Sequence, residues 1–396
     1  MTLHKKLCFC FLVLLAVGAC SSSDNSAAPI VGGTTEAGST EAGSTEDGST
    51  EAGSTEAGST EAGSTEAGST EAGSTEAGST EAGSTDSGGF ELLSSCQTVP
   101  QSILTENGGI ISSVLPADLS ASGARIVVLA EPDGELTGFD SKSGQIDYSP
   151  TASRLSQLMR YRVVDGSNTV LAEHQHRWVF EPVRVVPLGD SITSGVEYFD
   201  GSDLPPMNLR TGYRQFLYER LFNNNYRIDY LGQGGQSAGA DAGLVDPENN
   251  GYPGVDIEFL NGKLIEQLTE DATDIILLHI GTNNTPTDAS GIDDWLDTLD
   301  AWEAENNPVL ALVATIVPKR DVAQNAVVDA FNSDLRQRIQ QRTDDLVYLV
   351  EQNTAVLVSD ISDEPIGLHP NKTGYEKMAN VWYDALVSKE LLHKCD

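Results

Sequence analysis

Three short segments of this sequence carry side chains that could perform acyl-transfer chemistry together. A Gly-Asp-Ser corner ends at Ser191, a Gly-Thr pair is followed by Asn283, and a His-Pro-Asn segment begins at His369. A serine hydroxyl becomes a useful nucleophile when a neighbouring histidine takes its proton, and an amide N–H can stabilise the negative charge that then forms on the substrate oxygen. Each segment alone is weak evidence, because a Ser after Asp is most often a helix cap or a turn residue.

His369 is the histidine that best fits the part of general base. The other histidines fall in the N-terminal apolar region, in a β-rich region, in an apolar strand or after the last predicted helix: His4, His174, His176, His279 and His393. We expect His279, which lies in the strand, to be a satisfied core residue. No pair of histidines has the spacing of a zinc finger or a metalloprotease, so we expect no catalytic metal and no cofactor.

The elements that must position these segments alternate between strand and helix in the C-terminal half. Apolar runs typical of buried strands occur at 183–188, 227–231, 274–280, 309–316 and 346–350. Stretches typical of helices occur at 213–222, 255–268, 293–305, 326–341 and 374–392. This alternation predicts a parallel sheet buried on both faces, in which chemistry collects at the carboxyl ends of the strands.

Residues 183–390 resemble the SGNH, or GDSL-type, hydrolases. The resemblance rests on the three segments above, on Gly-Tyr-Arg at 212–214 and on the closing His-Pro-Asn-x-x-Gly-Tyr. It implies a flavodoxin-like three-layer α/β/α fold for an SGNH domain at 182–396. It also implies that Ser191 is the nucleophile and His369 the general base. The Ser191 N–H, a glycine N–H and the Asn283 amide would then form the oxyanion hole.

Two glycines could supply the remaining oxyanion N–H. We favour Gly254, because it would open a predicted helix where backbone N–H groups are unpaired. Its segment also resembles the Gly-Tyr-x-Gly-x-x-Ile segment of carbohydrate-esterase-like members. Gly232, which follows a predicted strand, is the alternative.

The resemblance breaks at the residue that should orient the histidine. The family usually has an Asp three residues before its His, and here that residue is Ile366, which cannot accept the imidazole N–H. Three interpretations stay open. Asp363 or Glu364 reaches the imidazole, a backbone carbonyl serves and leaves a Ser-His dyad, or the enzyme is impaired. The third group orients the imidazole and does not carry the proton, so its loss need not abolish activity.

The N-terminus predicts an export signal followed by a spacer. Two lysines, an apolar run at 7–17 and small residues before Cys20 resemble a bacterial lipoprotein signal at 1–20, with Cys20 as the lipidated residue. An ordinary signal peptide is the alternative. Residues 38–87 repeat a Gly-Ser-Thr-Glu-Ala unit without large apolar side chains. Such a segment cannot offset its ordering entropy, so we predict a disordered tether at 21–95.

A small β-sandwich domain is predicted at 96–181. Short β-rich runs occur at 124–130, 144–148, 159–164 and 177–180, with turn signals between them. Part of this region resembles bacterial cadherin-like or immunoglobulin-like repeats, which implies a spacing role. Carbohydrate binding is the alternative role.

Composition and cysteine usage limit the partners and the compartment. With 23 basic and 59 acidic residues the formal net charge is −36, which argues against nucleic acid and against charge-driven adsorption to anionic lipid. Cys8 and Cys10 fall in the signal. Cys96 and Cys395 therefore remain for one disulfide, with two free thiols as the alternative.

Together these features predict a serine esterase that is lipid-anchored in the cell envelope, at the outer membrane, and surface-exposed or periplasmic. Its expected partner is an acylated carbohydrate or another small ester, most plausibly an acetylated polysaccharide, and it touches the membrane through lipid alone. Two alternatives stay open. One is a lipase, lysophospholipase or thioesterase on the same scaffold, and the other is a non-catalytic glycan-binding surface protein.

Overall fold

A computed structural model describes residues 92–102, 109–132, 134–150, 155–233, 239–270, 272–284, 288–342 and 346–395. These residues all fall in one compact unit of the chain. The predicted lipoprotein signal with Cys20, and the predicted tether before residue 92, lie outside the described residues. Within the described ranges no helix is long and apolar enough to cross a bilayer.

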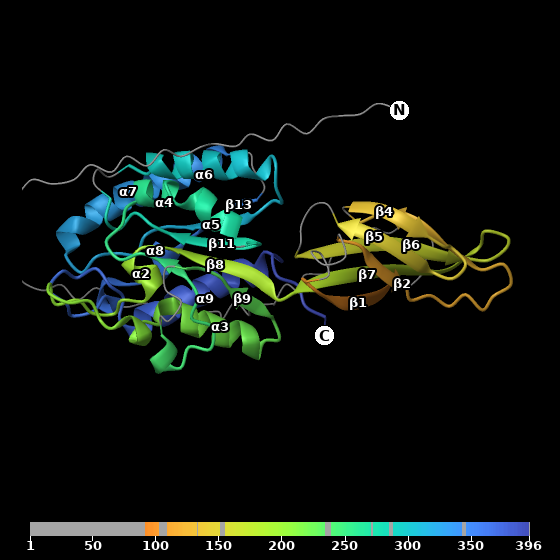
Figure 1. The fold of residues 1–396 in the computed structure, drawn as a ribbon, viewed down its shortest axis with the longest axis horizontal. Helices are drawn as coiled ribbons and strands as arrows, with labels where there is room; N and C mark the ends of the chain where they lie inside the picture. Colours follow the sequence, from red (N-terminus) through yellow and green to blue (C-terminus); the bar gives the residue numbers. More distant parts are fainter. Residues whose placement is uncertain are drawn as a thin grey trace, which may run out of the picture. The chain divides into compact units, whose positions relative to one another are not determined.

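The C-terminal region is built on one parallel sheet, drawn from green to blue in Figure 1. Its strands are β8 Val183–Gly189, β9 Ile228–Tyr230, β10 Asn250–Gly251, β11 Ile275–His279, β12 Leu310–Ala314 and β13 Val347–Val350. The order is β10-β8-β11-β12-β13, and β9 pairs with the same edge of β8 as β10. If β9 and β10 are counted as one strand, this is the flavodoxin-like order 2-1-3-4-5, whose ligand site lies where the order reverses, between β8 and β11.

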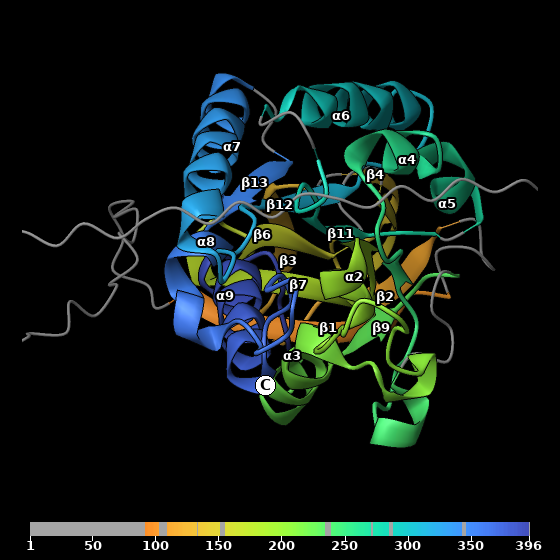
Figure 2. The ribbon, with the colours of Figure 1, turned by 90° about the vertical axis from the view of Figure 1, so that its left-hand side faces the viewer.

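Helices cover both faces of this sheet, as Figure 2 shows. One face carries α3 Gly212–Asn223 and α9 Lys372–Ser388, and the other carries α4 Ile257–Asn261, α5 Leu264–Glu270, α6 Ser290–Glu303 and α7 Val322–Gln341. Alternate residues of each strand feed the two cores. In β11, Ile275 and Leu277 pack under α3 and α9, whereas Ile276 and Leu278 pack on the opposite side. The predicted three-layer α/β/α fold is therefore confirmed.

A proline occupies the central strand β8 without breaking it. Val185 directs its carbonyl group to β9, and Gly189 directs its carbonyl group to β10. The backbone of Pro187, two residues from each of them, therefore faces the same edge of β8. Its position falls between the end of the pairing with β9, at Val185, and the start of the pairing with β10, at Leu188. The missing N–H of proline therefore costs no ladder hydrogen bond.

Four of the five predicted helices differ from the observed ones only at their ends, and the fifth is divided in two. The single helix predicted at 255–268 is two helices, α4 and α5, which are separated at Gly262 and Lys263. Glycine is a poor helix former, and α4 ends there. The remaining short helices are α2 Ser191–Ser194, η1 Met207–Leu209, η2 Ala240–Ala242, α8 Gln352–Ala355 and η3 Val358–Asp360.

Residues 92–181 form two further sheets. Their strands are β1 Leu92–Pro100, β2 Ile111–Val114, β3 Arg125–Ala130, β4 Gly134–Phe139, β5 Gln145–Pro150, β6 Ser156–Val164 and β7 Val170–Glu181. The sheets have the orders β1-β7-β6-β3 and β2-β5-β4, and they share one hydrophobic cluster that includes Tyr148 and Trp178. Strand β1 begins at Leu92, inside the segment predicted as tether. Kinship with cadherin-like or immunoglobulin-like repeats stays a prediction.

A disulfide joins Cys96 in β1 to Cys395 near the C-terminus, with the two Cα atoms 5.4 Å apart. The two residues are separated by 299 positions in sequence, so the bond closes a very long loop. In the chain-entropy account, closing a longer loop removes more freedom from the unfolded state.

We expect the paired substitution Cys96→Ser with Cys395→Ser to lower the free energy of unfolding by as much as about 5 kcal/mol. Urea titration of the mature protein, followed by circular dichroism, measures the change. A thiol titration supplies the control: the wild type should show no reactive thiol at Cys96 and Cys395 before reduction. Two reactive thiols in unreduced protein would contradict the bridge.

Candidate active site

Ser191 is held at the carboxyl end of β8, as the first residue of the short helix α2. The strand approaches β11 so closely at Gly189 that a Cβ there would lie 2.1 Å from the His279 carbonyl oxygen. Asp190 caps α2, because its Oδ1 accepts the N–H of Ile192 at 2.9 Å. Ser191 is 7% exposed, so its hydroxyl lies in a sheltered place close to the sheet edge.

The structure brings Ser191 and His369 together from opposite ends of the α/β region. His369 Nε2 lies 2.8 Å from Ser191 Oγ, and both side chains are buried. On the other side of the ring, His369 Nδ1 lies 2.9 Å from both Oε1 and Oε2 of Glu364. The three side chains therefore form a continuous Ser-His-Glu chain of hydrogen bonds, the arrangement that activates a serine for attack.

Glu364 is buried and surrounded by donors. Its Oε1 accepts the backbone N–H groups of Leu368 at 2.8 Å and His369 at 2.7 Å, and its Oε2 accepts that of Phe199 at 2.7 Å. Burial alone would raise the pKa of Glu364. The hydrogen bonds from the His369 ring and from the backbone outweigh burial, and the pKa is lowered. An ionised carboxylate only accepts, so Nδ1 carries the imidazole proton and Nε2 is free to accept the serine proton.

The other carboxylate considered from sequence does not reach the imidazole. The Asp363 side chain is 92% exposed and forms an ion pair with Arg320. Ile366, which stands where the family has its Asp, is 37% exposed. Of the interpretations left open by the sequence, the geometry therefore selects Glu364.

The candidate oxyanion donors lie on segments next to Ser191. Tyr252 N–H donates to the Gly189 carbonyl at 2.9 Å, which fixes the segment that carries Gly254 against the end of β8. Asn283 Nδ2 donates to the Val255 carbonyl at 2.9 Å, so the side chain of Asn283 and the backbone beside Gly254 are neighbours. The second N–H of the Asn283 amide is not used in this bond.

The reason given from sequence for choosing Gly254 is wrong. Gly254 does not open a helix, because Asp256 is the N-cap of α4 and its Oδ1 accepts the N–H of Phe259 at 3.0 Å. Gly254 instead lies in a turn with a φ of 83°. For Gly232 the structure offers a packing reason, since a Cβ there would lie 2.4 Å from the backbone of Asn249. The oxyanion role of Gly254 stays a prediction.

Two more titratable groups lie beneath the site. Burial raises the pKa of Asp190 to about 6, against the opposing effects of the Ile192 N–H and the nearby His369. Burial lowers the pKa of His279 to about 4, so this imidazole is neutral at physiological pH. His279 is a core residue, as expected. Its hydrogen bonds were also expected to be satisfied, but neither ring nitrogen has a hydrogen-bond partner within the described part of the chain. No group of three or more potential metal-ligating residues occurs in the described ranges.

Arg214 supports the segment that carries Ser191, and the sequence did not indicate this. Its side chain is fully buried, and its guanidinium donates to four carbonyl oxygens at 3.0–3.3 Å, those of Thr193, Ser194, Arg210 and Pro247. Two of these carbonyls belong to α2. A helix end leaves its last carbonyls unpaired, and Arg214 supplies donors for them. The Gly-Tyr-Arg segment was a signal of family resemblance, but its contacts with α2 could not be read from the sequence.

No family model matches the chain. A multidomain esterase of Ruminococcus flavefaciens is 26% identical over 231 residues, which are 52% of this chain and 28% of that protein. The chain therefore covers less than a third of this curated relative's length.

Among solved structures, a family 3 carbohydrate esterase of Clostridium thermocellum is 23% identical, with a TM-score of 0.44 over 53% of this chain and 99% of that one. A family 3 carbohydrate esterase of Talaromyces cellulolyticus is 22% identical, with a TM-score of 0.41 over 52% of this chain and 98% of that one. The sheet order and the positions of the three motif segments agree with the SGNH-type fold that the motifs predict.

Replacing Glu364 by Gln should lower kcat for ester hydrolysis by about 100- to 10,000-fold, because an amide can donate to Nδ1 and favour the wrong imidazole tautomer. The neighbouring Asp363→Asn is the matched control, and it should change kcat less than about twofold, since an exposed ion pair contributes little. Steady-state kinetics on a soluble acetate ester measure both. Equal losses in the two variants would contradict the assignment of Glu364.

Replacing Arg214 by Met should destabilise the protein by about 2–5 kcal/mol, because buried carbonyl groups would lose their donors. Thermal and urea unfolding measure the loss. Arg227→Met is the control, because Arg227 also donates to carbonyls but is exposed, and its loss should cost less than about 1 kcal/mol. A fully stable Arg214→Met would show that α2 does not depend on this guanidinium.

Proposed function

We propose that this chain is a serine ester hydrolase that removes acyl groups, chiefly acetyl groups, from carbohydrate. The observation that carries the proposal is the buried His369 ring, which is 2.8 Å from Ser191 Oγ on one side and 2.9 Å from Glu364 on the other. The curated relative that matches half of the chain is an esterase, which supports the same class of reaction.

In the first half of the proposed reaction, Ser191 Oγ attacks the ester carbonyl carbon while His369 Nε2 takes the hydroxyl proton. Glu364 stabilises the imidazolium that results, because its carboxylate stays ionised beside Nδ1. The carbonyl oxygen becomes an oxyanion, which the N–H groups of Ser191 and Gly254 and the amide of Asn283 would stabilise. Loss of one such donor typically costs about 100- to 1,000-fold in kcat.

His369 then returns the proton to the departing sugar oxygen as the substrate's carbonyl C–O bond breaks, and the acyl group stays on Ser191. In the second half, a water molecule attacks the acyl carbon and His369 accepts its proton as general base. The bond between the acyl carbon and Ser191 Oγ breaks as His369 passes this proton to Oγ, so the carboxylic acid leaves and the serine hydroxyl is restored. The same three side chains serve both halves, so no other group is needed for the proton transfers.

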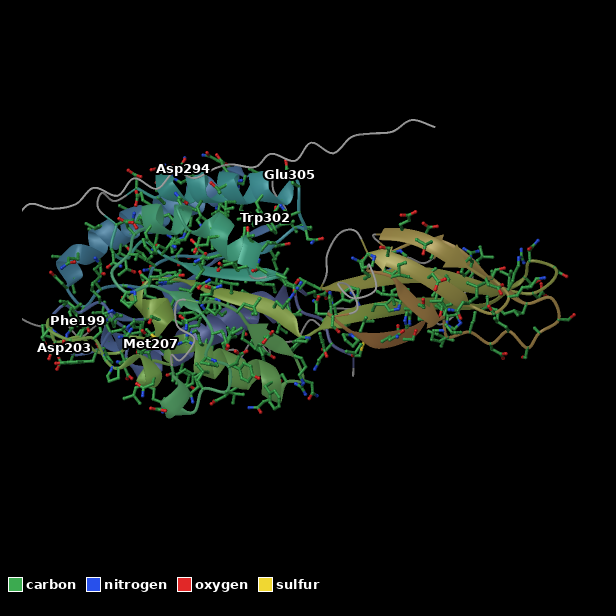
Figure 3. The ribbon with its side chains drawn as sticks, viewed as in Figure 1. Phe199, Asp203, Met207, Asp294, Trp302 and Glu305 are labelled. Atoms are coloured by element: carbon green, nitrogen blue, oxygen red, sulfur yellow. A yellow bond between two sulfur atoms is a disulfide. The ribbon has the colours of Figure 1, made fainter. Side chains whose placement is uncertain are left out.

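The carbohydrate part of the proposal rests on two features near Ser191. The segment at 251–257 resembles that of carbohydrate-esterase-like hydrolases, and its backbone pairs with the end of β8. The loop after α2 carries Tyr198, which is 49% exposed and precedes the Phe199 N–H that donates to Glu364. In Figure 3, Phe199 lies with Asp203 at one end of the α/β region. An exposed ring there could cover a sugar face.

The cellular setting belongs to the same proposal. A lipid on Cys20 would anchor the chain at the outer membrane, and the acidic repeats would act as a spacer between the lipid and the folded region. Such a placement suits an enzyme that acts on a polymer too large to enter the cell. The region at 96–181 would extend this spacing or bind glycan.

A panel of esters from acetate to long acyl chains, with acetylated xylan and pectin included, tests the function. We expect the highest kcat/KM on acetate esters and release of acetate from at least one polysaccharide. Ser191→Ala should lose this activity and also its labelling by a serine-reactive fluorophosphonate.

Two results would contradict the proposal. Comparable turnover by the wild type and Ser191→Ala would remove the serine mechanism. A kcat/KM that rises steeply with acyl length would favour the lipase or thioesterase alternative.

A further inference from the structure

The loop that follows β12 carries two cations, and only one of them has an acidic partner. Arg320 forms an ion pair with Asp363 and also donates to the Ser362 carbonyl at 3.3 Å. The ammonium of Lys319, the preceding residue, has neither an ion pair nor a hydrogen bond with any residue that the structure describes. Lys319 differs from the exposed unpaired cations of the described residues, such as Lys142, because it is half-buried.

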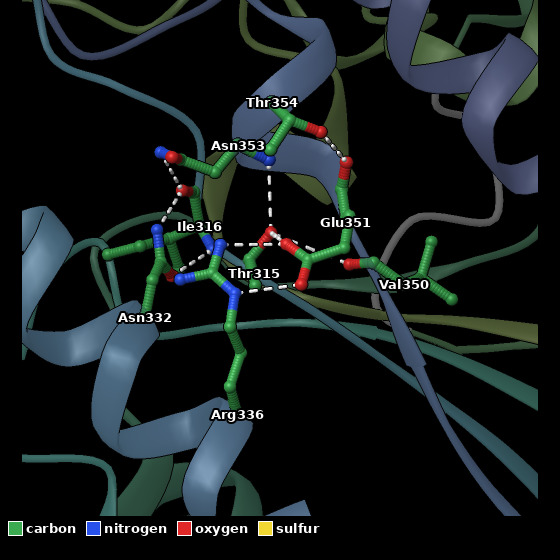
Figure 4. A network of polar contacts seen from close by, with 8 residues as sticks. All are labelled: Thr315, Ile316, Asn332, Arg336, Val350, Glu351, Asn353 and Thr354. Atoms are coloured by element: carbon green, nitrogen blue, oxygen red, sulfur yellow. Dashed lines mark hydrogen bonds and ion pairs between the residues drawn. The ribbon is translucent and has the colours of Figure 1, made fainter.

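The backbone of this loop is held firmly at its start. The Asn332 amide in α7 accepts the Ile316 N–H at 2.8 Å and donates to the Ile316 carbonyl at 2.9 Å. Asn353 Nδ2 donates to the same carbonyl at 3.0 Å, and its N–H donates to Thr315 Oγ1. Figure 4 shows these bonds together with the Arg336–Glu351 ion pair beside them.

The loop is held equally firmly around Lys319. Asn325 Oδ1 accepts the Lys319 N–H at 2.7 Å, and Asn325 Nδ2 donates to the Lys319 carbonyl at 2.9 Å. The next N–H, that of Arg320, donates to the Gly367 carbonyl at 2.9 Å. Gly367 lies between Glu364 and His369, so Lys319 is carried by a rigid loop that is bonded directly to the catalytic loop. A side chain on such a support is well suited to bind a substrate group.

Lys319 also interacts electrostatically with Asp190, the residue that precedes Ser191. It is half-buried, and burial lowers the pKa of its ammonium while the Asp190 carboxylate acts in the opposite direction. Asp190 itself is fully buried, and no direct ion pair joins the two side chains. Lys319 is therefore a partly desolvated cation beside the active site. A negatively charged ligand would replace the hydration that its ammonium loses on burial.

We propose that Lys319 binds a carboxylate of the substrate, so that the preferred substrates are acyl esters of acidic sugars such as uronates. This inference rests on the proposed ester hydrolysis and specifies its substrate class. The net charge of −36 repels an anionic sugar at long range, so a local cation is needed for such a sugar to bind. A neutral sugar needs no such group.

The test compares a monoacetylated glucose with the corresponding monoacetylated glucuronate, which carries a carboxylate in place of the CH₂OH group. Lys319→Ala should lower kcat/KM about tenfold on the glucuronate, mainly through a higher KM, and change it less than about twofold on the glucose. Lys319→Arg should retain most of the preference. Lys142→Ala, which removes one positive charge from an exposed turn, should leave both substrates unaffected.

Other kinetic outcomes overturn the inference. Equal losses on both sugars would show that Lys319 acts on the reacting ester and not on a substrate carboxylate. No loss on either would show that it has no part in recognition.

A binding measurement separates failure of this inference from failure of the proposed function. Calorimetry with Ser191→Ala and the acetylated glucuronate should show affinity that Lys319→Ala, added to the same protein, reduces about tenfold. Should the wild type hydrolyse no ester and yet bind the glucuronate through Lys319, hydrolysis is refuted and recognition stands. Should it hydrolyse acetylated glucose without any dependence on Lys319 for the glucuronate, hydrolysis stands and recognition is refuted.

Discussion

The active-site geometry depends on one buried carboxylate. Glu364 accepts hydrogen bonds from the His369 ring, from the N–H groups of Leu368 and His369, and from the N–H of Phe199. A buried carboxylate without donors would be very costly, so the folded chain must bring all of these groups to it. As a result, a single side chain orients the imidazole, closes its own loop and fixes the segment that follows the nucleophile helix.

The helix α2, which begins at Ser191, could not stand alone. Helix α2 has four residues, and isolated helices far longer than this are marginal in water. Asp190 satisfies an N–H at its start, and Arg214 satisfies carbonyls at its end. The carboxylate and the guanidinium are both buried, and both bond to backbone here rather than to each other. The position of Ser191 is therefore set by charged side chains that act on the backbone around it.

The sequence predicted those parts of the fold whose residues carry a local signal. Strands such as β11 are continuous apolar runs because both faces of the sheet are covered, and such runs are visible in the sequence. β10 has only Asn250 and Gly251, and nothing in these two residues indicates a strand. β1 was assigned in part to the tether because most of its side chains are exposed, and its parallel pairing with β7 joins residues about eighty positions apart. A strand that is mostly exposed carries no alternation of apolar and polar residues by which the sequence could indicate it.

In the candidate site, too, the sequence predicted only the residues that stand in a local sequence signal. Ser191, Asn283 and His369 stand in short motifs, so their types and order were enough to nominate them. Arg214 acts through carbonyl groups, which every residue has, and the sequence therefore holds no sign of its partners. Glu364 could only be one of several open interpretations, because the choice between it and Asp363 depends on which way the chain turns before His369.

That turn explains how a carboxylate reaches His369 without an Asp three residues before the histidine. Gly367 has a φ of 58°, and its N–H donates to the Glu364 carbonyl at 3.2 Å, so the chain reverses between Glu364 and His369. The reversal, together with the additional methylene of Glu, brings a carboxylate from five residues away to Nδ1. The role belongs to a position in space and not to a spacing in sequence. Ile366 has no part in the triad. Its side chain is uncharged, whereas an Asp at this position would add a negative charge to the loop that is bonded to Arg320.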